Sequence, residues 1–157
     1  MNLPCSFKLL LLLLMVCQLG ACNQLGVKPK ANEEASEQDM FEIQRRADQA
    51  YEDNDLVSAE KDYETLIKVS PEIASHWFRL GNIYVRTNRP VAAINLYREA
   101  VLRDPTFSKA WFNLSIVQLK QTAYSLNEML IYVDKNDPMY TRARELLDGI
   151  KQIVNTE

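Results

Sequence analysis

The chain has 157 residues, of which 47% are hydrophobic and 25% are charged, and its formal net charge is −3. This length leaves room for one domain of ordinary size, and four glycines are too few for a turn-rich β fold. Acidic and basic residues alternate through the second half instead of forming a basic stripe, which excludes a typical nucleic-acid-binding protein.

A short apolar run near the amino terminus predicts a signal peptide. The run from Leu9 to Cys17 is nine residues long and follows Lys8. A membrane-spanning helix needs about twenty apolar residues, so this run instead has the length of a signal-peptide core. We predict that residues 1–21 are a signal peptide.

The four residues that follow, "LGAC" at 19–22, resemble the lipobox of bacterial lipoproteins. In that family the cysteine receives diacylglycerol and is then acylated on its amine, which implies Cys22 as the lipidation site. Cys5 and Cys17 would leave with the signal peptide, so Cys22 would be the only cysteine of the mature chain. A plain secretory cleavage after Ala21, giving a soluble periplasmic protein, is the alternative.

The resemblance to lipoproteins also implies a location. Two or more acyl chains anchor a protein stably to a bilayer. Residue 23 is Asn, and by the sorting habit of Gram-negative lipoproteins this implies the periplasmic side of the outer membrane. Residues 22–38 are polar-biased, contain Gly26 and Pro29, and predict a lipidated amino terminus with a flexible tether.

From residue 39 onward the sequence repeats itself at a period of 34 residues. Trp77 and Trp111 recur at this spacing, as do Pro71 and Pro105. The middle unit carries a Trp-x-x-Leu-Gly-x-x-Tyr stripe followed by an Ala/Tyr/Ala stripe. This period and pattern resemble the tetratricopeptide repeat (TPR) family. The resemblance implies an all-α solenoid of about three helical hairpins plus a capping helix at the carboxyl end.

The boundaries of the units follow from the repeated prolines. In the third unit Pro138 comes one residue early, which predicts a shortened turn near Thr122. After it, Ala143, Leu147, Ile150 and Val154 share one helix face, as expected of a capping helix. We predict repeat units at 39–71, 72–105 and 106–138, and a capping helix and tail at 139–157.

Apolar residues on the helix stripes are expected to pack between neighbouring hairpins, because one hairpin cannot bury both of its stripes alone. A small residue at position 81 would let the next helix cross closely. The predicted packing residues are Trp77, Leu80, Gly81, Tyr84, Ala93, Tyr97, Ala100, Trp111 and Leu114.

The first helix of each unit is expected to line the concave side of the solenoid, with an aromatic and aliphatic floor that is acidic at one end and basic at the other. Such a groove would take a peptide or amphipathic helix from another envelope protein. The alternative is that the rings are covered by the capping helix, the tether or a second copy. The predicted groove residues are Phe41, Tyr51, Phe78, Asn82, Val85, Arg86, Lys109, Phe112, Ile116, Leu119 and Lys120.

The sequence offers little for catalysis or a metal. Its one histidine, His76, has no second histidine or cysteine nearby to share a metal, and we expect it at a surface or an interface. Gln44 and Asp48 stand where chaperone-binding TPR domains carry the Lys and Asn that grip a terminal carboxylate. We therefore predict a non-enzyme without chaperone-tail binding, whose only bound group is the lipid on Cys22.

Together the two resemblances imply a membrane-tethered adaptor for protein–protein interaction. Similar TPR lipoproteins assist pilus assembly and secretin placement, and others recruit cell-wall enzymes. A self-packed structural protein of the envelope, without a ligand in its groove, remains the alternative.

Overall fold

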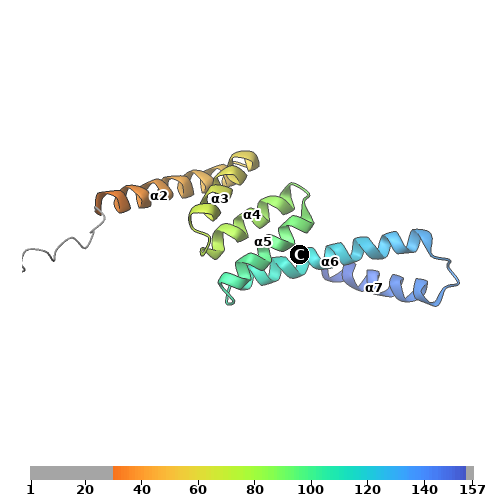
Figure 1. The fold of residues 1–157 in the computed structure, drawn as a ribbon. Coiled ribbons are helices and arrows are strands. Elements are labelled where there is room, and N and C mark those ends of the chain that lie inside the picture. The colour runs from red at the N-terminus through yellow and green to blue at the C-terminus, as the bar shows by residue number, and fades with distance from the viewer. Residues whose placement is uncertain (1–29, 155–157) are drawn as a thin grey trace, which may run out of the picture. The chain divides into compact units, whose positions relative to one another are not determined.

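The computed structural model describes the backbone of residues 30–154 and the side chains of residues 38–154. All regular structure in this range is α-helical, which confirms the predicted all-α class (Figure 1). The predicted signal peptide, the lipidation site Cys22 and the beginning of the tether lie outside the described residues. No helix in the described range is long and apolar enough to span a membrane.

The first helix, α2, runs from Lys30 to Glu52. Its first residues belong to a different unit from residues 40–154, which form one compact unit with their own core. Residues 30–38, which we predicted as the end of the flexible tether, are helical and belong to α2. This stretch is rich in Ala and Glu and has neither Gly nor Pro after Pro29, a composition that favours helix.

The next helices form the repeated hairpins. α3 spans Leu56–Val69, α4 spans Ala74–Arg86 and α5 spans Pro90–Arg103. The carboxylate of Asp55 caps α3 by accepting a hydrogen bond from the Ser58 amide at 3.2 Å. Pro90 occupies the start of α5, where its missing amide costs nothing.

The turns inside the two hairpins have the same backbone geometry. Asn54 and Asn88, which are 34 residues apart, have φ angles of 63° and 57°. Asn tolerates this left-handed conformation better than most residues because its short side chain can bond locally. The turn closes in both hairpins through an amide bonded five residues back, from Asp55 to Ala50 at 2.8 Å and from Arg89 to Tyr84 at 2.7 Å.

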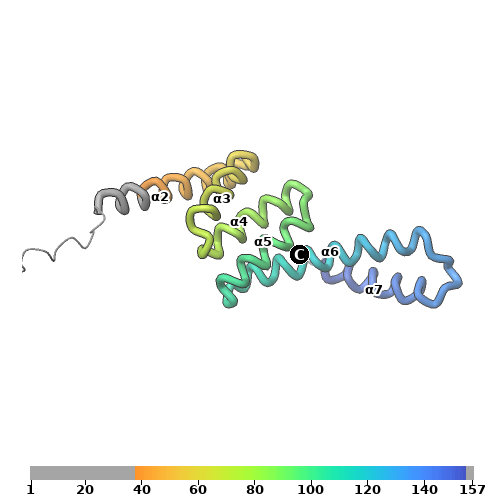
Figure 2. The backbone as a smooth tube through the Cα atoms, viewed as in Figure 1, coloured from red at the N-terminus to blue at the C-terminus, as the bar shows by residue number. Residues whose placement is uncertain are grey.

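The third repeat departs from this plan. α6 runs without a break from Ser108 to Tyr132, so the prediction of a turn near Thr122 is wrong (Figure 2). Thr122 stands where the two hairpins have Asn54 and Asn88, and a β-branched residue resists a positive φ. Tyr124 stands where the second hairpin has Pro90, so no proline breaks the helix either.

The last helix, α7, spans Pro138–Val154 and packs against α6 as its antiparallel neighbour (Figure 1). Ala143, Leu147 and Ile150 are buried, as the stripe of the predicted capping helix requires. The chain therefore ends with an α6–α7 hairpin, in which the partner of α6 comes from the predicted cap.

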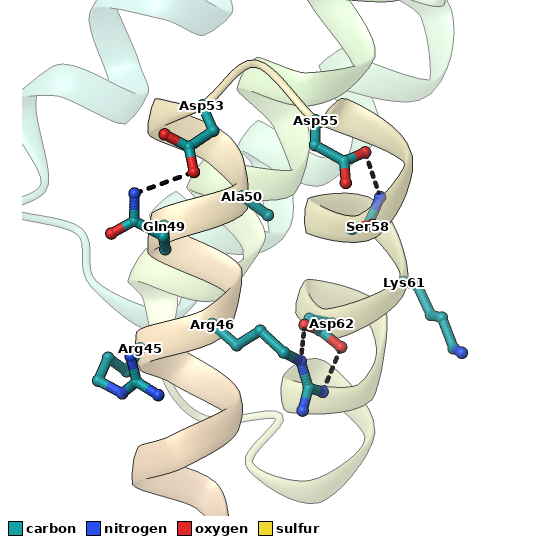
Figure 3. A pocket seen from close by; sticks show the side chains of 9 residues that line it. All are labelled: Arg45, Arg46, Gln49, Ala50, Asp53, Asp55, Ser58, Lys61 and Asp62. Carbon is teal, nitrogen blue, oxygen red and sulfur yellow. Dashed lines mark hydrogen bonds and ion pairs between the residues drawn. The ribbon is translucent and has the colours of Figure 1, made fainter.

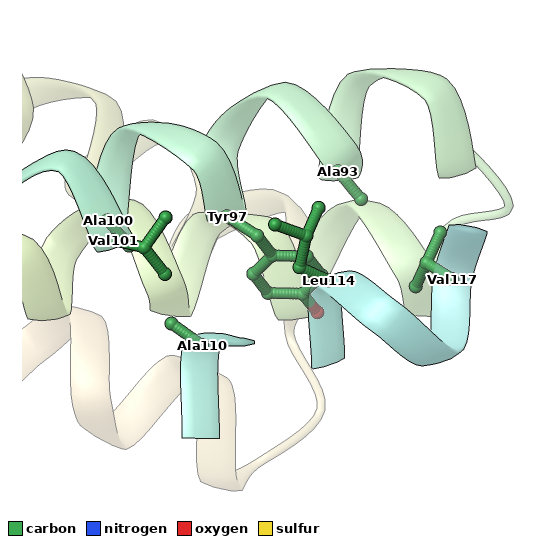
Figure 4. Close-up of a cluster of buried hydrophobic side chains, with 7 residues drawn as sticks. All are labelled: Ala93, Tyr97, Ala100, Val101, Ala110, Leu114 and Val117. Atoms are coloured by element: carbon green, nitrogen blue, oxygen red, sulfur yellow. The ribbon is translucent and has the colours of Figure 1, made fainter. Parts of the chain in front are cut away.

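Two clusters of buried side chains hold the unit together. The first joins α2, α3 and α4 and includes Ala47, Tyr63 and Leu80. The second joins α5 to the amino-terminal half of α6 (Figure 4). Its buried members are Ala93, Tyr97, Ala100, Val101, Ala110, Leu114 and Val117.

Most of the predicted packing residues take part in this core. Leu80, Gly81, Ala93, Tyr97, Ala100 and Leu114 are buried, while Trp77 and Tyr84 are partly buried against the second cluster. Trp111 is the exception, because 48% of its surface stays exposed. Trp111 was predicted to pack because a regular third repeat would have a second helix that folds back over it. In the structure α6 continues as one helix, so no such second helix covers Trp111.

Candidate functional site

A groove lies between the end of α2, the end of α4 and the amino-terminal half of α6. Its volume is about 340 Å³. We call it the inner groove and define it by the residues that line it. These are Tyr51, Asn82, Val85, Arg86, Tyr97, Phe112, Asn113, Ile116, Val117 and Lys120.

The structure thus brings together most of the residues that sequence analysis assigned to a partner-binding surface. Tyr51, Asn82, Val85, Arg86, Phe112, Ile116 and Lys120 all line the inner groove. Their assembly follows from the repeat, because positions one or two helical turns apart on successive first helices face the same side. That these residues bind a partner stays a prediction.

Besides Phe78, three predicted residues lie outside the inner groove lining. Phe41 is exposed near the start of the compact unit, Lys109 is exposed in the first turn of α6, and Leu119 is partly buried in the middle of α6. The predicted surface was drawn along the full length of each first helix. The hollow forms only where α2, α4 and α6 approach one another.

Phe78 belongs to the core more than to the groove. Its ring lies 4.8 Å from the ring of Phe107 and 5.9 Å from that of Tyr97, measured between centroids. The side chain is partly buried against the second core cluster. We expected this ring to face the groove, but it is not part of the inner groove lining, and Phe107, just before α6, packs against it.

The groove floor is a closed hydrogen-bond network. The Tyr97 hydroxyl donates to Asn82 Oδ1 at 2.8 Å, and Asn113 Nδ2 donates to the same oxygen at 2.9 Å. Burial raises the pKa of Tyr97 to about 12, so the hydroxyl stays protonated and keeps donating. The first repeat has the equivalent bond, from the Tyr63 hydroxyl to Asp48.

One wall of the groove is built from Tyr51 and Arg86, and Arg79, outside the lining, also contacts the Tyr51 ring. The guanidinium carbons of Arg79 and Arg86 lie 5.0 Å and 4.8 Å from the centre of the Tyr51 ring, within the range of a cation–π contact. Arg86 also donates to Asn54 Oδ1 at 2.6 Å. The positive charge of Arg86 is therefore held in place at the groove edge.

At the mouth of the groove, exposed apolar side chains lie beside positively charged ones. Phe112 is 55% exposed and Val85 is 38% exposed, so both could still bury surface against a ligand. Arg86 and Lys120 are the cations of the lining, and no carboxylate lines it. The predicted basic end of the concave face is thus part of the inner groove, whereas the predicted acidic end, with Asp48 and Glu52, is outside it.

Sequence reasoning missed three residues of the lining. Tyr97 was assigned only to packing, although its hydroxyl reaches the floor. Asn113 and Val117 were not considered for the groove, yet they are one turn apart on α6 and face it together. The sequence feature that could have revealed them is the pair of amide side chains, Asn82 and Asn113, on the first helices of successive repeats. Tyr97, whose buried hydroxyl needs a hydrogen-bond acceptor, lies next to them.

A second hollow, of about 580 Å³, lies between α2 and α3 (Figure 3). It is lined mainly by charged and polar side chains, several of which form hydrogen bonds or ion pairs with one another. Arg46 donates two hydrogen bonds of 2.6 Å to the carboxylate of the buried Asp62. Arg46 stands 34 residues before Leu80 in the sequence, and a charged residue at this position suits the polar end face of a solenoid. This hollow is a polar end of the repeat array, in which a guanidinium and a carboxylate already pair with each other.

The single histidine is buried, contrary to the expectation of a surface or interface position. Only 5% of His76 is exposed, and its Nδ1 has no hydrogen-bond partner. Burial lowers the pKa of His76 below its usual value of 6.5. No group of three or more metal-ligating side chains occurs among the described residues. His76 is therefore a core residue of α4, at the boundary between the first and the second repeat.

Comparison with known proteins agrees with this geometry. The model of the tetratricopeptide repeat matches residues 45–106 and 81–138. Among solved structures, the TPR2B domain of yeast Sti1, in a complex with pHsp70, is similar with a TM-score of 0.52 and 21% sequence identity. The similarity covers 73% of this chain and 97% of that one. At this identity it shows the fold, an all-helical TPR solenoid, and no more. No curated protein matches the sequence.

Proposed function

Because the chain belongs to the tetratricopeptide repeat family, we propose that it is an adaptor whose inner groove holds a peptide or an amphipathic helix of a partner protein. The observation that carries the proposal is the groove itself. It joins exposed apolar side chains, Phe112 and Val85, to a fixed cation, Arg86. A partner segment with apolar residues and at least one carboxylate matches this lining.

The free energy gained by burying the exposed apolar side chains of the groove limits the affinity for a partner. Full burial of a side chain such as Phe or Val contributes roughly 1.5–3 kcal/mol. Phe112 and Val85 are already partly covered, so each contributes less than this. After the cost of ordering the partner, these two contacts fall short of the about −8 kcal/mol of a micromolar complex, so charge pairing with Arg86 and Lys120 has to add to them.

The similar yeast domain was solved in a complex with pHsp70, which supports a protein partner in kind. The same partner is not proposed here. Gln44 and Asp48 occupy the positions where a terminal carboxylate would be gripped, and Gln44 Nε2 donates to Asp48 Oδ2 at 2.8 Å. A carboxylate brought to this place would meet the negative charge of Asp48.

The proposed adaptor is tethered to a membrane. This part of the proposal rests on the sequence alone, on the lipobox-like residues that end at Cys22 and on the apolar run before them. The predicted lipid would hold the protein on the periplasmic side of the bacterial outer membrane. The partner would then be another envelope protein, for example a component of pilus or secretion assembly. Recruitment of cell-wall enzymes, or a self-packed structural role, are the alternatives.

Site-specific photocrosslinking in cells would test the groove. A photoreactive phenylalanine analogue placed at Phe112 lies at the groove edge, and the same analogue at Val91, exposed on α5 outside the groove, serves as the matched control. We expect an adduct with one partner protein from position 112 and not from position 91. If position 112 gives no adduct while the variant accumulates normally, the groove does not hold a partner.

A charge-reversal variant tests whether the partner brings a carboxylate to the groove. Lys120→Glu changes the charge of the groove edge without touching the core, because Lys120 is exposed. The adduct from position 112 should decrease strongly in this background if the partner brings a carboxylate. An unchanged adduct would leave an apolar partner and remove the acidic part of the proposal.

A further inference from the structure

The lining of the inner groove holds a hydrogen-bond donor and an acceptor that no other described residue uses. Asn82 Oδ1 accepts from the Tyr97 hydroxyl at 2.8 Å and from Asn113 Nδ2 at 2.9 Å. The other end of each amide pair, Asn82 Nδ2 and Asn113 Oδ1, has no hydrogen-bond partner among the described residues. In this range the only buried side-chain nitrogen or oxygen without a partner is His76 Nδ1, so both amide ends are open to solvent.

The orientation of these two free groups is fixed by the bonds behind them. The buried Tyr97 hydroxyl needs an acceptor, and the Asn82 amide offers one only through Oδ1, so Nδ2 is turned away from the tyrosine. Asn113 donates through Nδ2, so its Oδ1 is turned away from Asn82. The N–H of Asn82 and the carbonyl of Asn113 are therefore positioned before any ligand binds.

The first repeat shows the same position without a free group. Asp48 corresponds to Asn82 at the 34-residue period, and it accepts from the Tyr63 hydroxyl as Asn82 does from Tyr97. Its second oxygen accepts from Gln44 Nε2 at 2.8 Å, so both ends of this carboxylate are used within the chain. A carboxylate thus suffices to hold the tyrosine, and holding the tyrosine does not by itself require the amide of Asn82.

The free donor and the free acceptor lie at a spacing that an extended chain can match. The two amides are joined by one hydrogen bond of 2.9 Å, and standard bond lengths then keep Asn82 Nδ2 and Asn113 Oδ1 within about 7.4 Å of each other. An extended chain turns the N–H and C=O groups of every second residue to the same side, about 6.8 Å apart. One extended segment can therefore bond both amides.

An α-helix does not match this pair. Its interior main-chain groups are bonded within the helix, and its free N–H groups are in the first turn while its free carbonyls are in the last. A helix whose apolar side lies in the groove would cover Asn82 Nδ2 and Asn113 Oδ1 without bonding them through its main chain. Covering polar groups without a bond is costly, so the lining disfavours a helix.

We propose that the inner groove binds its partner as an extended segment, whose main-chain carbonyl accepts from Asn82 Nδ2 and whose main-chain N–H donates to Asn113 Oδ1. This inference rests on the proposed function, because it names the form of the partner in the same groove. The main-chain bonds fix the register of the segment. An apolar side chain of the segment then meets Phe112 or Val85, and a carboxylate meets Arg86.

The probe for this proposal is the partner segment that is crosslinked from position 112 in cells. The crosslinked segment is located by mass spectrometry and synthesised as a peptide, and then as a series in which one main-chain amide at a time is replaced by an ester. An ester has no N–H to donate. Fluorescence anisotropy with the full chain in a non-ionic detergent measures the affinity of each peptide.

We expect one ester position at which the affinity decreases about tenfold, because Asn113 Oδ1 then loses its donor. In Asn113→Ala the same ester should change the affinity less than about twofold, since the acceptor is already absent. Gln118→Ala removes an amide from α6 outside the groove lining and is the matched control, in which the ester effect should remain complete.

Asn82→Asp tests the donor without removing the acceptor of Tyr97, as Asp48 does in the first repeat. It should weaken binding of the unmodified peptide about tenfold, because no N–H remains for the carbonyl of the segment. The loss should persist at high salt, where repulsion between exposed charges is screened. A loss that disappears at high salt would mean that Asn82 gives the segment no hydrogen bond.

The remaining outcomes separate this inference from the proposed function. An adduct from position 112 whose peptide loses affinity with esters at many consecutive positions, equally in Asn113→Ala, would mean that the partner binds as a helix. The adaptor would then stand and the extended form would be wrong. If position 112 gives no adduct, the groove holds no partner and both proposals are wrong.

Discussion

The ring of Tyr97 lies against the backbone of Gly81, so close that a Cβ at position 81 would come within 2.7 Å of Cε1 and 2.8 Å of Cδ1. The ring cannot move aside easily, because it is buried and its hydroxyl is bonded to Asn82. This contact sets how closely α4 and α5 cross. It also places the Tyr97 hydroxyl at the groove floor.

Replacing Gly81 by alanine should therefore destabilise the protein. Overpacking of a filled core costs typically 1–3 kcal/mol, which exceeds the gain of about 0.5–1 kcal/mol that alanine brings to a helix interior. Urea unfolding followed by circular dichroism measures the difference. Gly149→Ala is the matched control, because nothing lies within 4 Å of a Cβ there. The control should stabilise the protein, and a stabilising Gly81→Ala would mean that the α4–α5 crossing is looser than described.

The turn at Asn88 gives a second prediction. Its φ of 57° disfavours residues with a Cβ unless their side chain bonds locally. Asn88→Ala should lower the free energy of unfolding by about 1 kcal/mol, whereas Asn88→Gly should change it little. The two variants are compared by their urea midpoints. Equal midpoints for alanine and glycine would show that the left-handed turn does not contribute to stability.

His76 predicts a pH dependence of stability. Burial lowers its pKa in the folded state below the 6.5 of the unfolded chain, so the unfolded state binds more protons in the window between these values. Stability is thus fully present above about pH 6.5 and decreases as the pH falls through the unfolded pKa towards the lower folded one. Unfolding free energies measured between pH 8 and pH 5.5 should show this decrease.

The variant His76→Gln isolates the effect, because glutamine keeps an amide donor and does not titrate. Its unfolding free energy should depend less on pH over the same window. The charges of Asp48 and Glu72 act in the opposite direction, raising the pKa of His76, so the decrease in the wild type should be modest. Identical pH profiles for the two proteins would assign the decrease to other groups.

Lipidation of Cys22 can be measured directly. Cells grown with labelled palmitate should incorporate label into the wild-type protein and not into Cys22→Ser. Cys17→Ser is the control, since this residue would be removed with the signal peptide and its variant should keep the label. Label retained in Cys22→Ser would contradict the lipoprotein assignment and favour the plain secretory alternative.

The repeated hairpins could be predicted from sequence because their spacing is fixed by several residue types at once. Trp77 needs a partner for its ring and Gly81 needs a ring close to it, and the structure supplies both contacts, with Arg103 and with Tyr97. The extension of α6 was also visible in the sequence, at Thr122 and at Tyr124, which replaces the proline of the second hairpin. Thr122 replaces the asparagine that both hairpin turns use, but the proline count pointed to a deletion and hid this difference.

The groove was predictable only in part, for a physical reason. Periodicity shows which face of a helix a residue occupies, so Val85, Phe112 and Ile116 were placed correctly on one side. It does not show which rings are covered by a residue between helices, and Phe107, just before α6, packs against Phe78. Phe107 follows the 34-residue period, since Ile73 stands at the equivalent place before α4, but the period does not show which ring such a side chain reaches.

Because α6 is unbroken, the part that lines the groove and the part that packs on α7 belong to one rigid helix. In a regular repeat these two parts would lie on separate helices. At its amino-terminal end it presents Phe112 and Ile116 to the groove, and at its carboxyl-terminal end it carries the residues that pack on α7. This helix is about 38 Å long for its 25 residues. Because no break lies between the two ends, a ligand that turns α6 about its axis must turn both ends by the same angle. A rotation of α6 by a ligand in the groove would thus also move the surface on which α7 packs.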